Sequence, residues 1–138
     1  MIERLLIITV VAVIAVFVYQ MYTRRQLAFV TANRNIDPLL RGLNPNIPAI
    51  VYFTTPNCIP CKVQQQPALD KLKTDLGENI QIIQVDATQE PEVADRWGVL
   101  SAPTTFVLNT DGQAKAVNHG VADVHKLKRQ IQVMKPVS

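Results

Sequence analysis

The sequence predicts an α/β domain preceded by one long apolar helix, and three observations support this fold class. The first is an uncharged run from Leu5 to Tyr22, LLIITVVAVIAVFVYQMY. The second is an alternation of apolar, β-branched segments with helix-spaced segments after residue 48. The third is a Cys-Ile-Pro-Cys pair, the only two cysteines in 138 residues, between the first predicted strand and the helix that follows. With 48% hydrophobic residues, the chain has room for one small domain and an apolar extension.

The uncharged run predicts a membrane anchor. Its 18 residues would span about 27 Å as a helix, close to the thickness of a bilayer core. A cleaved signal peptide would end in a small-residue site of the A-x-A type, whereas this run passes through Tyr19 and Tyr22 into Arg24 and Arg25. Tyrosines at headgroup level followed by arginines in water are typical of a membrane exit. A buried core helix would need a polar face, which the run lacks.

The net charge of +3 is confined to the N-terminal part of the chain. Residues 1–41 hold five arginines against Glu3 and Asp37, and residues 42–138 hold nine basic and nine acidic side chains. We therefore expect no nucleic-acid-binding surface on the domain. Arg4 precedes the apolar run and three arginines follow it closely, so the positive-inside rule favours a cytoplasmic C-terminal domain over an extracytoplasmic one.

Changes in composition divide the chain into three predicted parts. Residues 1–25 form the transmembrane anchor with its flanks. Residues 26–47 form a juxtamembrane linker, in which QLAFVTANRN can extend the helix by two or three turns. The following DPLLRGLNPNIP is rich in proline, Asn and Asp, which favour irregular structure. Residues 48–138 form the folded domain.

Four elements are predicted in the first half of the domain. AIVYFTT (49–55) is apolar and β-branched or aromatic at most positions, as expected of a central strand buried on both faces. KVQQQPALDKLKTDL (62–76) has apolar residues at helical spacing, with a kink expected at Pro67. NIQIIQVDA (79–87) is a second strand. EPEVADRWGV (90–99), with acids and a proline in its first turn, is a second helix.

The second half of the domain is predicted to hold a hairpin and a last helix. TTFVL (104–108) is a strand, Asp111-Gly112 supplies the turn, and QAKAV (113–117) returns. VADVHKLKRQIQVM (121–134) is an amphipathic helix whose apolar face begins at Val121. In this order, we expect the first two strands to pair in parallel and the last two to pair antiparallel.

The motifs of this domain resemble those of a known family. YFTTPNCIPCK at 52–62, VDA at 85–87, a helix ending in WGV, SAPTTFVLNTDG at 101–112 and Gly120 before the last helix occur in the order found in thioredoxins. The resemblance covers roughly residues 48–134. It implies a thioredoxin-like fold, in which helices flank a central mixed β-sheet, and exchange of a dithiol and a disulfide with protein partners.

Cys58 and Cys61 are the predicted catalytic residues. At a strand-to-helix junction, the first sulfur lies over unpaired backbone N–H groups at the positive end of the helix, which favours the thiolate. Cys58 is therefore the expected nucleophile, and Cys61, one turn further on, is the expected resolving thiol. A structural disulfide would stabilise so short a loop only slightly. A zinc site needs about four ligands, and only His119 and His125 could join the cysteines as soft ligands, so we expect no metal and no cofactor beyond the cysteine pair. An idle, packed pair remains an alternative.

Five residues near the cysteines are predicted to contact a substrate polypeptide. In thioredoxins, the proline that matches Pro103 is cis and leaves the preceding backbone free. The resemblance therefore implies that Ala102 pairs with an extended substrate strand. Ile59 and Pro60 lie between the cysteines. Asn57 stands where thioredoxins usually carry tryptophan, and helix capping and substrate contact are the two interpretations of its side chain.

The sequence departs from the family pattern inside the domain. Tyr52 occupies the position of a buried aspartate that in the family assists proton transfer to the resolving thiol, and Ile82 occupies that of a nearby lysine. A more apolar interior would raise the pKa of Cys61 and slow any step that requires its deprotonation. We therefore expect slower general reduction than by a soluble thioredoxin. Thioredoxins have a strand and a helix before the central strand, whereas only linker-like sequence precedes residue 49 here. The edge of the sheet is therefore either shortened or formed by a stretch that the sequence pattern does not identify.

The sequence thus predicts a membrane-tethered thiol–disulfide oxidoreductase that acts on thiols or disulfides of proteins at the membrane surface. Tethering would raise the effective concentration of such partners. The direction of electron flow is left open by the motifs. The alternative is a non-catalytic accessory subunit of a membrane protein complex, in which the apolar helix packs among other helices.

Overall fold

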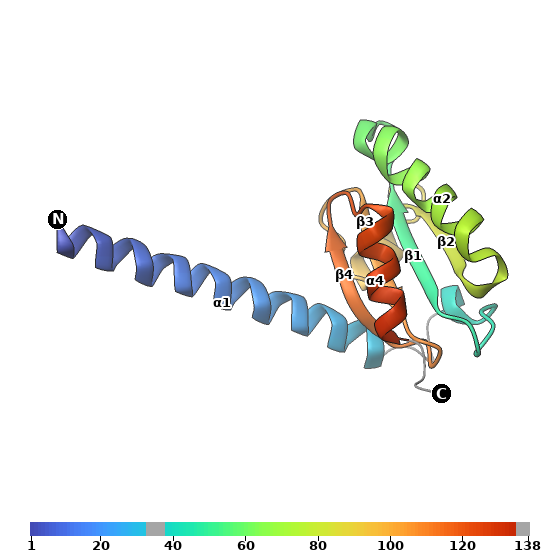
Figure 1. Ribbon diagram of the computed structural model, residues 1–138, viewed down its shortest axis with the longest axis horizontal. Coiled ribbons are helices and arrows are strands. Elements are labelled where there is room, and N and C mark those ends of the chain that lie inside the picture. The colour runs from blue at the N-terminus through green and yellow to red at the C-terminus, as the bar shows by residue number, and fades with distance from the viewer. Residues whose placement is uncertain (33–37, 135–138) are drawn as a thin grey trace.

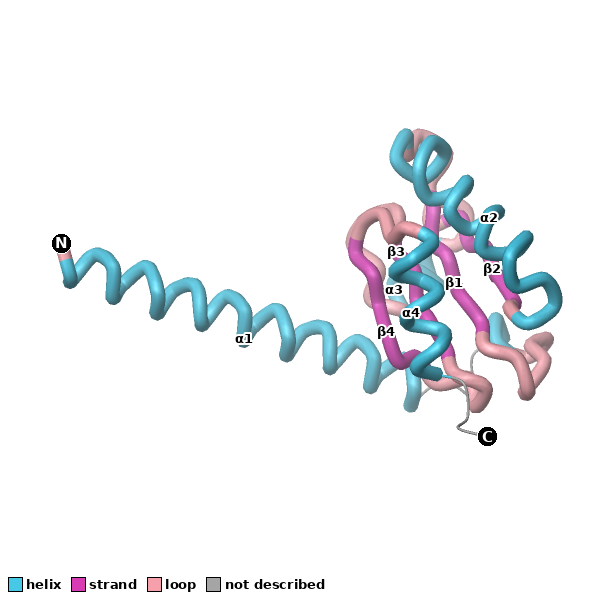
Figure 2. The backbone as a smooth tube through the Cα atoms, in the orientation of Figure 1, coloured by secondary structure: helices cyan, strands magenta, loops and turns pink. Residues whose placement is uncertain are grey.

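The computed structural model describes residues 1–32 and 38–134, and shows a long helix that projects from a small α/β domain (Figures 1 and 2). The long helix is α1 (Ile2–Ala32). The elements that follow it in chain order are the 3-10 helix η1 (Pro38–Leu40), β1 (Ala49–Thr54), the π-helical turn η2 (Cys61–Gln65), α2 (Gln66–Leu76), the 3-10 helix η3 (Gly77–Asn79), β2 (Gln81–Asp86), α3 (Pro91–Arg96), β3 (Thr104–Leu108), β4 (Ala114–His119) and α4 (Val124–Met134).

The four strands form one mixed sheet in the order β2-β1-β3-β4. Strand β1 pairs in parallel with β2 and antiparallel with β3, and β3 pairs antiparallel with β4, so the predicted pairing is confirmed. In β1 the residues from Ala49 to Phe53 are all buried, as their apolar sequence predicts for a central strand. In the described part of the chain no strand precedes β1, which agrees with the first of the two alternatives, a shortened sheet edge.

Helices cover both faces of the sheet and enclose two apolar clusters. Helices α2 and α4 lie over one face, and their cluster contains both cysteines (Figure 1). The other cluster is centred on three aromatic rings, Phe53, Trp97 and Phe106, whose centroids lie 4.9–5.8 Å apart. Leu27 of α1 and three leucines around η1 pack against this second cluster, which also includes Val85 and Ala94. The segment ahead of β1 therefore takes part in the core.

Helix α1 continues without a break from the apolar run into the domain. The segment 26–47, predicted as a linker, begins with the last turns of this helix, which continues to Ala32. The extension predicted over QLAFVTANRN is confirmed to that residue, and its last three residues lie outside the described part of the chain. Gln26 is only 7% exposed, and its Nε2 donates to the backbone oxygens of Trp97 at 2.8 Å and Gly98 at 2.7 Å. The Tyr22 hydroxyl also donates to Gly98 O, at 3.2 Å. These bonds fasten the helix to two backbone carbonyl groups at the end of α3.

The apolar part of α1 lies outside the domain core. Residues Ile2–Ala28 form a helix that is long and apolar enough, by length and composition, to cross a membrane. Its large apolar side chains from Ile2 to Val18 are exposed, since the helix projects away from the sheet (Figure 2). A core helix of a soluble domain would bury such a surface.

Two details of the helices differ from expectation. In place of the kink predicted at Pro67, the structure has a π-helical turn that ends at Gln65, two residues before the proline. The turn forms there because proline lacks the N–H that would continue the α-helical pattern. Helix α4 begins at Val124, so Val121 lies in the preceding segment and is exposed, where an apolar helix face was predicted.

Candidate active site

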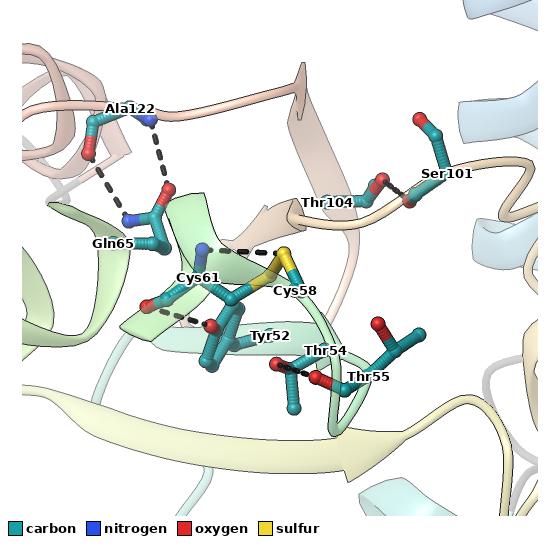
Figure 3. Close-up of a disulfide and its surroundings, with 9 residues drawn as sticks. All are labelled: Tyr52, Thr54, Thr55, Cys58, Cys61, Gln65, Ser101, Thr104 and Ala122. Carbon is teal, nitrogen blue, oxygen red and sulfur yellow. Dashed lines mark hydrogen bonds between the residues drawn. A yellow bond between two sulfur atoms is a disulfide. The ribbon is translucent and has the colours of Figure 1, made fainter. Parts of the chain in front are cut away.

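Cys58 and Cys61 form a disulfide just beyond the C-terminal end of the buried strand β1 (Figure 3). The strand ends at Thr54, and a turn closed by a hydrogen bond from the Cys58 N–H to the Thr55 carbonyl, at 3.2 Å, leads into the helix. This is the strand-to-helix junction that the sequence predicts. The turn sets the disulfide at one end of the sheet, beside the segment that precedes β3.

The Cys58 sulfur caps the start of the helix. The backbone N–H of Cys61 donates to Cys58 Sγ at 3.2 Å, which satisfies one of the free N–H groups of the first turn. The capping interpretation of Asn57 is wrong: its side chain is exposed and forms no hydrogen bond with the described residues. In the reduced protein the same N–H and the helix end would favour a Cys58 thiolate.

The two cysteines differ in access to solvent. Cys58 is 9% exposed and Cys61 only 1% exposed. An incoming thiol therefore reaches Cys58 first, whereas Cys61 is placed to attack from inside. Pro60 and Ile59, between the cysteines, are exposed beside them.

Cys61 belongs to an apolar cluster that also contains Tyr52. Tyr52 is buried, and its hydroxyl donates to the Cys61 carbonyl oxygen at 3.4 Å (Figure 3). Burial raises the pKa of Tyr52, and a hydrogen bond with Thr54 offsets part of this effect. Ile82 packs against the same cluster, opposite Ile50 on the neighbouring strand. Tyr52 and Ile82, which stand where the family carries an aspartate and a lysine, thus lie in the core that contains Cys61.

Gln65 supports the site, although the sequence analysis did not single it out. Its side chain is fully buried, donates to the Ala122 carbonyl at 3.1 Å and accepts from the Ala122 N–H at 2.9 Å (Figure 3). These two bonds join the π-helical turn after Cys61 to the segment between β4 and α4. The run of three glutamines before Pro67 gives no sign of which one is buried.

The segment before β3 borders the disulfide. The Ala102–Pro103 peptide bond is cis. Thr104 Oγ1 donates to Ser101 O at 2.6 Å, and the Gly120 N–H donates to Pro103 O at 2.9 Å. Within the described residues, neither the N–H nor the C=O of Ala102 is hydrogen-bonded. A cavity of about 210 Å³ lies beside Ala102. The backbone of Ala102 and this cavity offer an extended peptide both main-chain partners and room for a side chain.

Exposed apolar side chains surround this end of the sheet. Leu100 is 82% exposed and Ile59 is 72% exposed, and Val63 and Val121 are exposed as well. Of these four residues, only Ile59 is predicted from the sequence to contact a substrate. Leu100 lay inside no predicted element, and Val63 and Val121 were assigned to apolar helix faces. Apolar side chains left in water beside a reactive group are typical of a protein-contact surface.

The two histidines lie on the surface, and one of them contacts α1. The ring of His119 lies 6.2 Å from that of Tyr19 and 6.3 Å from that of Tyr22, measured between centroids. Partial burial lowers the pKa of His119. His125 is exposed on α4. Over residues 1–32 and 38–134, no group of three or more His, Cys, Asp or Glu side chains is arranged to hold a metal ion.

A family model described as thioredoxin matches residues 30–133, which is most of the chain. The chain belongs to the thioredoxin family. Its β-sheet, its disulfide after β1 and the segment around Pro103 give it the thioredoxin-like oxidoreductase fold. The thioredoxin match extends back to residue 30 and so includes the end of α1.

Similar proteins include both thioredoxins and thioredoxin-like proteins. The SPbeta prophage-derived thioredoxin-like protein YosR of Bacillus subtilis is 41% identical over 64 residues, which are 46% of this chain and 71% of YosR. The thioredoxin of Rhodospirillum rubrum is 32% identical over 91 residues, which are 66% of this chain and 83% of that protein. The solved structure of Fasciola hepatica thioredoxin superposes with a TM-score of 0.59 at 26% identity, covering 67% of this chain and 85% of the other.

Proposed function

We propose that this protein is a membrane-anchored thiol–disulfide oxidoreductase that exchanges the Cys58–Cys61 dithiol and disulfide with protein partners. The observation that carries the proposal is the asymmetry of the disulfide. Cys58 is the more accessible cysteine, and its sulfur accepts a hydrogen bond from the Cys61 N–H, whereas Cys61 is almost fully buried. Family membership supports thiol–disulfide exchange in general, and α1 supports attachment to a membrane.

The proposed exchange needs only the two cysteines of this chain. In the reducing direction, the Cys58 thiolate attacks one sulfur of a partner disulfide, and the other partner sulfur leaves as a thiolate. The Cys61 thiolate then attacks Cys58 Sγ, forms the Cys58–Cys61 bond and releases the first partner sulfur. The partner gains two electrons and two protons, and the protein loses the same number. The reverse sequence oxidises a partner dithiol.

Trapping tests this proposal directly. In Cys61→Ser, the mixed disulfide between Cys58 and the partner cannot be resolved and should accumulate. It should appear on non-reducing gels as a band that a reductant removes. Cys58→Ser is the matched control, because it keeps a cysteine in the motif but removes the accessible sulfur. Equal trapping by both variants, or by neither, would contradict the proposed roles.

The double variant Cys58→Ser/Cys61→Ser separates redox chemistry from a purely structural role in a membrane complex. If exchange is the function, this variant should lose all activity toward a disulfide substrate while α1 still brings it to vesicles. A cell in which the double variant replaces the wild type without any loss of function would instead favour the accessory-subunit alternative.

A further inference from the structure

The end of the uncharged segment of α1 coincides with the start of its contacts with the domain. No charged residue occurs from Leu5 to Thr23, and the exposed Arg24 and Arg25 follow. These 19 residues correspond to about 28 Å of helix, so a bilayer around them would end near Tyr22. Tyr19 and Tyr22 already contact His119, and so the structure places no spacer between the apolar segment and the domain.

These contacts lie at the disulfide end of the sheet. His119 pairs with Thr104, the residue after Pro103, and the next residue, Gly120, donates to the Pro103 carbonyl. On the other side, Gly98, which accepts from Tyr22 and Gln26, begins the segment that leads to Ala102. Helix α1 therefore holds both flanks of the Ala102–Pro103 segment.

The opposite end of the sheet lies further from the apolar segment. Ala49 starts β1 five residues before Thr54, about 17 Å away along the strand. The uncharged segment of α1 ends at Thr23, and the helix continues for nine more residues to Ala32. This continuation adds about 13 Å along the helix axis, away from the membrane exit. In Figure 1 the N-terminal half of α1 points away from the domain on the side of β4. Of the two ends of the sheet, the disulfide end is the one closer to the membrane exit.

The surface at this end suits a polypeptide that emerges from a bilayer. Leu100 and Val121, both exposed, follow the two α1 contact points Gly98 and His119 by two residues each. Leu100 and Ala102 line the same cavity, and Val121 follows Gly120, which donates to the Pro103 carbonyl. The backbone N–H and C=O of Ala102 are unpaired within the described residues. An extended segment could pair with Ala102 and cover these apolar side chains, as apolar residues next to a membrane span would.

We propose that the natural partner is a membrane-embedded protein whose reacting cysteine lies at the bilayer surface, in an extended segment next to one of its own membrane spans. This inference rests on the proposed function. The partner class follows from geometry, because the contacts of α1 hold the disulfide end of the sheet near the membrane exit. Cysteines far from the bilayer would react less often, because α1 keeps the disulfide away from them.

Model peptides test the distance dependence. Full-length Cys61→Ser protein is reduced and reconstituted into vesicles of phosphatidylcholine and phosphatidylglycerol, together with a single-span peptide. The peptide carries one cysteine as a mixed disulfide with thionitrobenzoate, after a spacer of 3 or 15 prolines, about 9 or 46 Å long. Attack by Cys58 forms the protein–peptide disulfide and releases thionitrobenzoate, which is followed by absorbance. We expect the short spacer to react at least tenfold faster, and equal rates or a faster long spacer would overturn the inference.

Two controls separate this inference from the proposed function. A soluble peptide with the same activated cysteine reports exchange without any membrane requirement. No reaction with it would refute the exchange function, and failure of the protein to float with vesicles would refute the anchor. If both controls succeed and the spacers react equally, only the partner class is wrong. In Tyr19→Ala/Tyr22→Ala, the rate ratio between the spacers should fall toward one with the soluble rate unchanged. An unchanged ratio would overturn the role of these contacts.

Discussion

The hydroxyl of Tyr52 donates a hydrogen bond to the backbone carbonyl of Cys61, with 3.4 Å between the two oxygens. Because burial raises its pKa, this tyrosine is a neutral donor at physiological pH. A phenol in that state does not take up a proton, as a carboxylate at the same place would. Tyr52 therefore holds the backbone of the resolving cysteine without serving as its base.

Removing only the hydroxyl should thus affect stability more than exchange. In Tyr52→Phe the ring stays in the core, and we expect the free energy of unfolding to fall by about 1 kcal/mol at most, since one neutral hydrogen bond is lost. The second-order rate of insulin reduction should stay within about twofold of wild type. Urea unfolding in detergent and the insulin assay measure the two quantities. A tenfold slower reduction would show that the hydroxyl takes part in proton transfer.

Adding a carboxylate should accelerate resolution. In Tyr52→Asp the new group can accept the Cys61 proton, so we expect release of the partner from the mixed disulfide to become about tenfold faster or more. The loss of a buried ring should lower stability by about 3 kcal/mol or more. Tyr52→Asn is the matched control, because it creates a similar cavity but cannot accept a proton. Single-turnover release followed across pH measures the effect, and equal rates for the Asp and Asn variants would disprove it.

Local sequence patterns were sufficient to predict the domain's strands and the position of the disulfide. Strand β1 is an almost continuous apolar run, β2 is rich in β-branched residues, and the hairpin has Asp111-Gly112 in its turn, so each is specified by neighbours in sequence. The strand-to-helix junction at Cys58 follows from the same order. These features depend on residues within a few positions of one another.

The contacts between α1 and the domain could not be predicted in this way. Gln26 binds carbonyl groups more than 70 residues later, and Tyr19 contacts a histidine at the end of β4. Each of these residues also fits the simpler picture of an interfacial anchor followed by a linker. The same reason applies to Gln65, whose partner Ala122 is 57 residues away. Polar side chains that pair with distant backbone groups carry no local periodic signal.

The paired hydrogen bonds of Gln65 should be costly to remove. In Gln65→Leu the N–H and C=O of the buried Ala122 lose their partners, and we expect the free energy of unfolding to fall by about 2–3 kcal/mol. Gln64→Leu, at the exposed neighbouring position, is the matched control and should change stability by less than about 0.5 kcal/mol. Urea unfolding of both variants in detergent measures the difference. Similar losses in the two variants would contradict the structural role of Gln65.

His119 should make stability depend on pH near neutrality. Partial burial lowers its pKa from the ordinary value of 6.5, so between the two values the unfolded chain binds more protons than the folded chain. Stability therefore rises with pH through this window, and its His119 contribution is fully present only above the unfolded value. We expect wild-type protein to lose stability as the pH falls from about 7.5 through 6.5 toward the lowered pKa, and His119→Gln to lose less over the same range.

Thermal unfolding in detergent at a series of pH values measures this difference between wild type and His119→Gln. His125→Gln, at an exposed position of α4, is the matched control and should keep the wild-type dependence. The carboxyl groups of Asp75, Asp86 and Asp123 have pKa values below the ordinary 3.8, so their contribution to stability is lost only in a more acidic range, as the pH falls toward those lowered values. A pH dependence that persists unchanged in His119→Gln would show that the packing of His119 against Tyr19 and Tyr22 is not its source.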